Sequence, residues 1–251
     1  MPYGLYISAE GAHAQNKRLE VLANNLANVE TTGFKRDLTI LQARYAEETQ
    51  RGMDYPGSRT INDISGGVLV KKTATDYEPG PMKRTGTSTD MAVNGDGFFV
   101  IRKGGRDLLT RAGNFMLNAD GRMTTQDGDP VLDQDANPID IDPEAGPWQL
   151  TPDGGIAQDG QVTYLALVNP RSLGDLVKIG DNCFRPLAPV RPVEPEQRQV
   201  VNGFLEMSDV RPTLEMMDMI EASRGFEANV NMIRNQDQMM GSLVNRVLKP
   251  A

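Results

Sequence analysis

The chain has 251 residues, enough for one large domain or two smaller ones. Its formal net charge of −8 argues against nucleic acid or an anionic membrane as the main partner, because phosphate groups are bound by basic surfaces. Cys183 is the only cysteine and His13 the only histidine, which excludes internal disulfides, Cys-based zinc sites and paired-histidine metal centres. The first residues lack the basic leader and apolar run of a secretory signal peptide, and we find no apolar stretch long enough to span a membrane.

Residues 1–36 are predicted to form an N-terminal axial helix. Small or apolar residues recur there with spacings that alternate between four and three, with Asn16 filling one gap: Leu5, Ala9, Ala12, Leu19, Ala23 and Leu26. This spacing is typical of a coiled-coil seam. Gly33 lies where a helix would stop.

The middle of the chain is predicted to be an inserted β domain, reached through an outward connecting segment at residues 37–75. Within residues 76–185, short alternating runs are separated by turn pairs such as Asn94-Gly95, Gly104-Gly105 and Asp120-Gly121. Such pairs are strong hairpin signals, since the central positions of these turns need positive φ. The spacing of the runs favours a small barrel or sandwich.

Residues 186–212 are predicted to be a Pro-rich return strap followed by a short strand. Prolines recur there every third residue, at Pro186, Pro189, Pro192 and Pro195, which is the period of a polyproline II helix. A semi-rigid strap could carry the chain back towards its helical end. The alternative is a ligand for a proline-recognition domain.

Residues 213–251 are predicted to form a C-terminal axial helix that pairs with the first. Its seam steps three and four residues without a slip: Met216, Met219, Ser223, Phe226, Val230, Ile233, Asp237, Met240, Val244 and Val247. The predicted fold class is therefore α+β, with paired terminal helices in a coiled-coil-like axial domain and an inserted all-β barrel or sandwich. The alternative is that both helices are buried on the chain's own globular core.

We find no pattern that predicts a catalytic, metal or cofactor site. Asp133, Asp135, Asn137 and Glu144 occupy four ligand positions of a calcium EF-hand loop, but Pro138 stands where that loop needs Gly. The chain is therefore not expected to be an enzyme. The competing hypothesis is an extracellular β-domain enzyme or binding module that depends on the Asp and Glu residues of 127–144.

Four stretches, in order, resemble the bacterial flagellar hook and basal-body rod proteins. They are residues 22–36 (LANNLANVETTGFKR), 90–101 (DMAVNGDGFFVI), 109–132 (LTRAGNFMLNADGRMTTQDGDPVL) and the run from 202 that continues to 239. In its length and in the run around residues 210–227 the chain resembles the proximal rod (FlgF) type more than the distal rod (FlgG) type or a hook-like axial protein.

The resemblance implies a structural subunit that self-assembles helically and transmits motor torque to the hook in bacterial motility. It implies export by the flagellar type III apparatus without a cleaved signal peptide, and a place in the basal-body rod in the periplasmic space. The implied partners are copies of the chain, other rod proteins and the export apparatus, with no nucleic acid, membrane insertion or cofactor. The residues expected in the assembly interface are Leu5, Ala9, Ala12, Leu19, Leu22, Leu26, Met216, Met219, Phe226, Val230, Ile233, Met240, Val244 and Val247. The family signature is carried by Asn24, Asn25, Leu26, Ala27, Asn28, Gly33 and Phe34.

Overall fold

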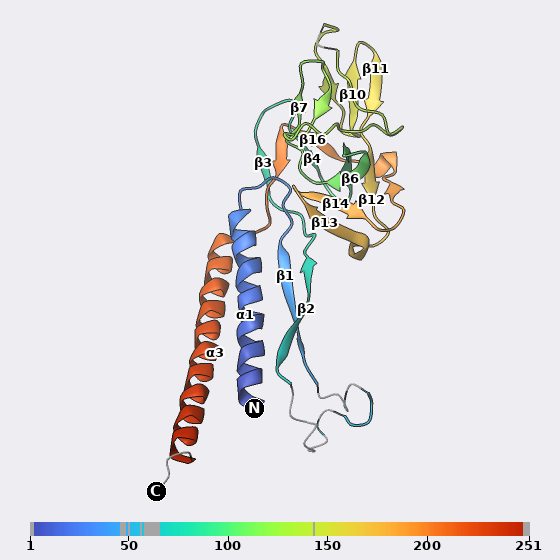
Figure 1. Ribbon diagram of the computed structural model, residues 1–251. Helices are drawn as coiled ribbons and strands as arrows, with labels where there is room; N and C mark the ends of the chain where they lie inside the picture. The colour runs from blue at the N-terminus through green and yellow to red at the C-terminus, as the bar shows by residue number, and fades with distance from the viewer. Residues whose placement is uncertain are drawn as a thin grey trace. The chain divides into compact units, whose positions relative to one another are not determined.

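The computed structural model describes residues 3–45, 49, 51–55, 57, 66–142 and 144–247, and two compact units make up the chain (Figure 1). The helical unit comprises Met1–Ala27, Asp37–Asp76 and Arg211–Ala251. The β unit comprises Asn28–Arg36 and Tyr77–Val210. The α+β class, with terminal helices and a β-rich middle, is thus confirmed.

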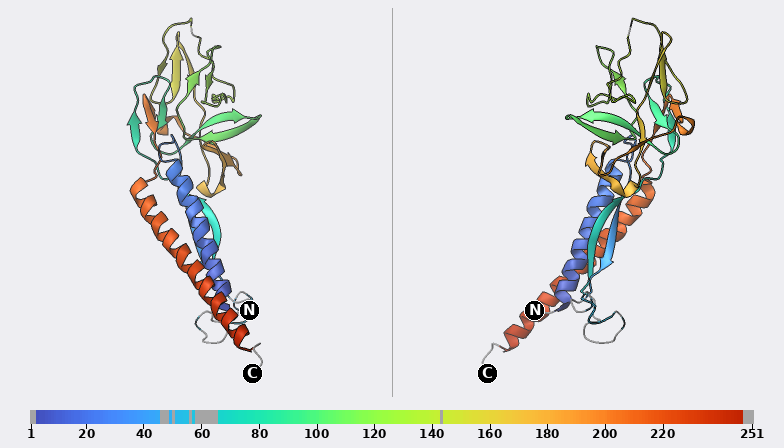
Figure 2. Two further views of the ribbon diagram at one scale, coloured as in Figure 1. Left: turned by 60° about the vertical axis from the view of Figure 1, so that its left-hand side comes forward. Right: turned by 90° about the vertical axis from the view of Figure 1, so that its right-hand side faces the viewer.

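The helical unit is built on two long helices, α1 (Tyr3–Ala27) and α3 (Pro212–Val247). They run antiparallel and in contact with each other, side by side in Figure 1 and crossing in the right-hand view of Figure 2. Pro212 occupies the first turn of α3, where its missing N–H is no loss. The α1 helix ends at Ala27, before the predicted limit at residue 36, because residues 28–32 form turns and Gly33 adopts φ +67°. None of the described helices is long and apolar enough to cross a membrane.

A two-stranded ribbon completes the described part of the helical unit. Strand β1 (Asp37–Ala43) pairs antiparallel with β2 (Val68–Thr75), with an irregularity between Ile40 and Leu41. The ribbon packs beside α1, and an ion pair of 3.1 Å joins Arg44 Nη1 to Glu10 Oε1. Residues 37–75, predicted as a connecting segment, therefore return along the helix where they are described. Residues 46–48, 50, 56 and 58–65 of that segment lie outside the described part.

The β unit is organised around an open sheet of six strands in the order β13-β14-β6-β5-β12-β15. Their bounds are β5 (Phe98–Lys103), β6 (Arg106–Thr110), β12 (Leu167–Asn169), β13 (Leu176–Gly180), β14 (Cys183–Pro186) and β15 (Arg191–Pro192). Gly104 and Gly105 turn β5 into β6 with positive φ at both positions, as the sequence predicted. The two edges, β13 and β15, do not pair with each other, so the described strands form no closed barrel.

Smaller sheets surround the six-stranded one. Antiparallel pairs join β3 (Met82–Arg84) to β17 (Phe204–Glu206), β4 (Met91–Val93) to β16 (Val200–Asn202) and β7 (Met116–Leu117) to β8 (Met123–Thr124). A three-stranded sheet contains β9 (Gln149–Leu150), β10 (Gly155–Gln158) and β11 (Gln161–Tyr164). Two short 3₁₀ helices, η2 (Leu173–Asp175) and η3 (Pro195–Gln197), lie in the connections.

The core of the β unit fills both faces of strand β5. Phe99 and Ile101 point into one buried cluster, and Phe98 and Val100 into another. Because successive side chains of a strand point to opposite faces, a run buried throughout marks a sheet covered on both sides.

The Pro-rich segment also belongs to the β unit. Arg191 and Pro192 form the edge strand β15, where proline is tolerated because the outer side needs no N–H donor. The segment expected to be a strap therefore adds an edge to the main sheet.

Candidate functional site

The contact line between α1 and α3 is made mostly of polar and small residues, with Leu22 as a buried apolar exception. Asn25 Nδ2 donates to Glu215 Oε2 at 3.3 Å, and both side chains are buried. Arg18 forms an ion pair of 3.2 Å with Asp218. Further along, Gly11 lies directly against the Asn229 side chain. The helices therefore meet along a line that is rotated by about one residue from the predicted apolar seam.

The residues expected in the assembly interface flank this line, except Leu22, which lies on it, and most of them are only partly covered. Ala12 and Leu22 are buried, whereas Leu5, Leu19, Leu26, Met219, Phe226, Val230 and Ile233 are half-buried, and Ala9, Met216, Met240 and Val244 are exposed. The side chain of Val247 lies outside the described part. The contacts therefore do not form a coiled coil closed by the predicted seam. In such a coiled coil the apolar seam residues would be buried throughout against the facing helix.

A second set of apolar residues on α3 is exposed, and the sequence prediction missed it. Met217 is 62% exposed and Met232 is 54% exposed, and at 3.6 residues per turn they lie on one side of the helix with Leu214, Met239 and Leu243. Ile220 is exposed on the opposite flank. Exposed apolar residues gathered along one helix mark a surface suited to protein contacts.

Asn25 of the signature holds the end of α1 to the ribbon. Its side chain accepts from the backbone N of Asp37 at 3.0 Å and donates to the backbone O of Asp37 at 2.9 Å. Together with its bond to Glu215, this side-chain amide joins three separate segments of the helical unit. Among the other signature residues, Asn24 and Ala27 are exposed, and Leu26 and Asn28 are half-buried.

Gly33 and Phe34 lie in the β unit. Gly33 adopts φ +67°, and a Cβ there would overlap the backbone of Arg111 and Ala112, so glycine is required. Its backbone N donates to Glu206 O at 2.7 Å. Phe34 is buried, and Lys178 Nζ lies 3.8 Å from the centre of its ring.

A buried ion network follows directly on Phe34. Lys35 Nζ lies 2.6 Å from Glu206 Oε1, and Arg111 Nη1 lies 3.2 Å from Glu206 Oε2. Lys35 is only 1% exposed and Glu206 only 2%. Backbone groups complete the network: Lys35 donates to Glu78 O, and Gly80 N donates to Glu206 Oε1. The segment between α1 and β1 is thus tied into the β unit by charge.

The electrostatics of the network follow from its burial. Burial lowers the pKa of Lys35 and of Arg111, and Glu206 opposes the shift in both cases. Each cation is stable in the interior only because a carboxylate lies against it. Sequence reasoning missed this network, because Lys35, Arg111 and Glu206 are far apart in the chain and each reads as a surface residue.

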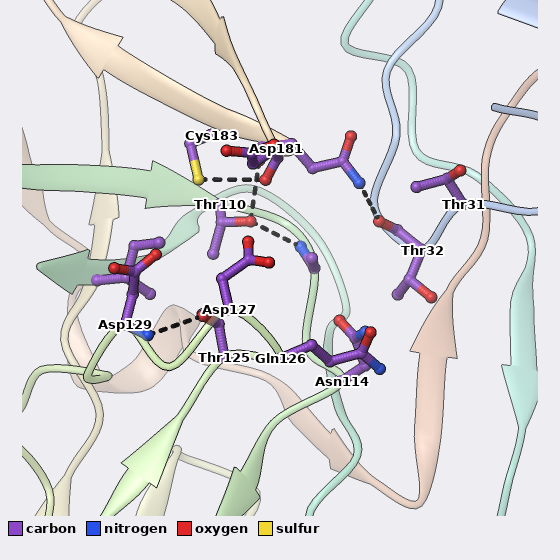
Figure 3. A pocket seen from close by; sticks show the side chains of 13 residues that line it. Thr31, Thr32, Thr110, Asn114, Thr125, Gln126, Asp127, Asp129, Asp181 and Cys183 are labelled. Atoms are coloured by element: carbon purple, nitrogen blue, oxygen red, sulfur yellow. Dashed lines mark hydrogen bonds between the residues drawn. The ribbon is translucent and has the colours of Figure 1, made fainter. Parts of the chain in front are cut away.

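One cavity of about 180 Å³ lies in the β unit beside Thr31 and Thr32, with Asp127, Asp129 and Asp181 on its wall (Figure 3). Lys103 forms ion pairs with two of these carboxylates, since its Nζ lies 2.8 Å from Asp181 Oδ2 and 3.3 Å from Asp129 Oδ2. These carboxylates thus carry their own cation.

The cavity also contains Cys183. Burial raises the pKa of this thiol to about 11, so it is protonated at neutral pH and a poor nucleophile. Its Sγ donates to Asp181 O at 3.2 Å (Figure 3). The polar groups that line the cavity therefore form hydrogen bonds mainly with one another.

The described site is that of a structural protein: a covered β unit joined to a pair of helices with apolar residues on the outside. Three family profiles match the chain. They are described as "Flagella basal body rod protein" over residues 5–35, "Flagellar hook protein FlgE/F/G D1 domain" over residues 92–164 and "Flagellar basal body rod FlgEFG protein C-terminal" over residues 201–246.

Whole-length relatives agree with these matches. The chain is 33% identical over 250 residues to the flagellar basal-body rod protein FlgF of Caulobacter vibrioides, covering 99% of each chain. It is 34% identical over 263 residues to the rod protein FlgG of Agrobacterium fabrum, covering 98% of this chain and 99% of the relative. It is 32% identical over 260 residues to the FlgG protein of Bacillus subtilis, covering 96% and 97%.

The chain belongs to the flagellar basal-body rod protein family. It is a structural subunit of the flagellar basal body that assembles with other rod proteins. The family is structural and not enzymatic, so the prediction that the chain is not an enzyme is confirmed, and the hypothesis of a β-domain enzyme has no support.

Proposed function

We propose that the chain is a subunit of the proximal rod, where apolar residues of α1 and α3 join it to copies of itself and to other rod proteins. The observation that carries this proposal is the polar contact line within the helix pair. Because the pair closes through Asn25, Arg18 and the glycines, apolar side chains such as Met217 and Met232 remain exposed. Burying them against a neighbour adds about 25 cal/mol for each Å² removed from water.

The interface proposed here contains the predicted seam and the exposed side of α3. The seam residues are half-buried or exposed for the most part, so a neighbouring helix can cover them further. Contacts of this kind between different surfaces of successive copies do not close on themselves and generate a helical assembly. The many methionines of α3 suit neighbours of different shape, since Met repacks easily.

Substitution of one exposed methionine tests the interface. Met232→Asp places a charge on the proposed contact surface, while Asn231→Asp places the same charge on the adjacent exposed position. We expect Met232→Asp to abolish rod assembly and swimming, and Asn231→Asp to retain both, with equal thermal unfolding of the two isolated proteins. Normal rods with Met232→Asp would contradict the proposed interface.

The proposed place in the proximal rod is supported by the motifs and by the whole-length match to a FlgF relative, although the percent identities to FlgF and FlgG relatives, 33% and 34%, are nearly equal. The second candidate is the distal rod. Expression in strains lacking either the FlgF or the FlgG protein separates the two: the proposal expects swimming to return only in the strain without FlgF. Restoration only in the strain without FlgG would assign the distal rod.

The proposal also includes the route and the place of assembly. The chain would pass through the flagellar export apparatus uncleaved and stack in the periplasmic space, where the rod transmits torque from motor to hook. The mass of the chain recovered from purified basal bodies tests the route. A mass that lacks the N-terminal residues of the printed sequence, beyond the first methionine, would contradict export without cleavage.

A further inference from the structure

Three glycines of the helices α1 and α3 each face a side-chain amide of the other helix. A Cβ on Gly4 would lie 2.8 Å from Gln236 Nε2, and a Cβ on Gly11 would lie 2.7 Å from Asn229 Oδ1. At the third place the roles are reversed, and a Cβ on Gly225 would lie 3.2 Å from Gln15 Cδ. Each amide therefore fills the space that a side chain on the facing glycine would need.

These pairs share one register. The two residue numbers add up to 240 in each of them, and also in the hydrogen-bonded pair of Asn25 and Glu215. A constant sum means that the two antiparallel helices keep the same axial alignment over the whole length that the pairs span. Figure 1 shows the two helices side by side over that length, and the right-hand view of Figure 2 shows them crossing.

A shift by one heptad is the natural error of such a pair, since the same helix faces would still meet. The glycine–amide pairs oppose it. Shifted one way, Gln15 would face Asp218, and shifted the other way it would face Met232, so the long amide loses the room that Gly225 provides. Because this pair is reversed relative to the other two, no heptad shift places all three amides opposite glycines.

We infer that Gly4, Gly11 and Gly225 are positioning residues that set a single register between the terminal helices, with amides and not apolar side chains as their partners. A polar residue that specifies register at some cost in stability is known in coiled coils. The cost is visible here, because Gln15 Oε1 and Gln236 Oε1 are buried without a hydrogen-bond partner among the described residues.

The register has a consequence for assembly, and this step rests on the proposed function. It brings Gln236 opposite Gly4, near the start of α1 at Tyr3, while α3 continues to Val247. Met239, Met240, Leu243 and Val244 are exposed on this extension. A heptad shift would move the extension by about 10 Å, so the register decides which apolar residues face a neighbouring subunit.

An exchange of one glycine and its amide tests the inference. Spin labels at Lys17→Cys and Gln238→Cys, both on exposed positions of the full-length chain, report the axial offset of the helices, and a heptad shift changes it by about 10 Å. We expect Gly11→Asn to broaden or shift the distance, since two amides then meet. The double variant Gly11→Asn with Asn229→Gly should restore the original distance, because it keeps one glycine and one amide in the pair.

The control is Gly241→Ala, a helical glycine whose Cβ would meet no atom within 4 Å. It should leave the distance unchanged. The inference is overturned if the original chain gives a distance that disagrees with the described register, if Gly11→Asn leaves the distance unchanged, or if the double variant behaves like Gly11→Asn. Single-cysteine variants account for any label on Cys183.

The distances are measured on the isolated chain and are independent of the proposed function. Swimming of cells with the double variant tests the functional step separately. If the distance is restored while swimming is not, the register stands and its role in assembly fails.

Discussion

The two units of this chain differ in how completely they cover their apolar residues. In the β unit, Phe99, Met91 and Ile101 are fully buried, and even the charged side chains of Lys35 and Glu206 have internal partners. In the helical unit, the helix pair closes through polar and small residues while Met217 and Met232 remain exposed. The β unit thus covers its own apolar residues, whereas the helical unit presents a surface that a neighbouring subunit can cover.

The largest expected effect is the loss of unfolding free energy when the buried ion network of the β unit is broken. Glu206→Gln leaves Lys35 and Arg111 without their carboxylate, and removing one partner of a buried ion pair costs about 3–5 kcal/mol. Denaturant unfolding measures this loss. Glu196→Gln, an exposed carboxylate of the same unit, is the control and should change the unfolding free energy by less than about 0.5 kcal/mol. An equal effect of both substitutions would contradict the role of the network.

The next largest effect is expected when a leucine is replaced by alanine in each of the two units. Leu109 is buried in the β unit, so Leu109→Ala should cost about 2–5 kcal/mol of unfolding free energy. Leu243 is exposed on α3, so Leu243→Ala should change the free energy of the isolated chain by less than about 0.5 kcal/mol. Comparable losses in urea unfolding would show that the helical unit covers this surface by itself.

A smaller effect concerns the junction within the helical unit. Asn25→Ala removes the two hydrogen bonds between its side chain and the backbone of Asp37, and the expected cost is about 1–3 kcal/mol. Hydrogen exchange should show faster exchange at the end of α1 and at the start of β1, with the β unit unaffected. Asn231→Ala, at an exposed position of α3, serves as the control. Unchanged exchange at Asp37 in the Asn25 variant would argue against this role.

The smallest effect concerns the thiol of the β unit. Because burial raises the pKa of Cys183 to about 11 from an ordinary value of 9.0, the folded state holds this proton when the unfolded state has released it. The stabilising contribution is therefore present below pH 9 and is lost as the pH rises to about 11. Cys183→Ala should flatten the fall in stability over that window. At pH 8 the native thiol should react with iodoacetamide about a hundredfold more slowly than an unfolded one, and equal rates would contradict its burial.

Local features of the fold followed from the sequence. The two terminal helices, the hairpin turn at Gly104-Gly105 and the β-rich middle depend on spacing and on turn residues, which act over a few neighbouring positions. The sequence likewise contains a single cysteine, Cys183, and a single histidine, His13, so few of the residue types common in catalytic sites are present. The positive φ required at Gly33 was expected as a helix stop and is found in the segment that follows α1.

Only the tertiary structure decided which face of each helix meets the other and which charges are buried. The heptad spacing of α3 fits either the line of Met216 and Met219 or the neighbouring line of Glu215 and Ala222, and the facing glycines select the second. Lys35 and Glu206 meet because the segment after α1 is bound to strand β17, where Gly33 N donates to Glu206 O, and no local pattern encodes this contact between distant segments. The periodicity of a sequence indicates that a helix has an apolar face. Which residues contact the partner helix depends on how closely the two helices can approach each other.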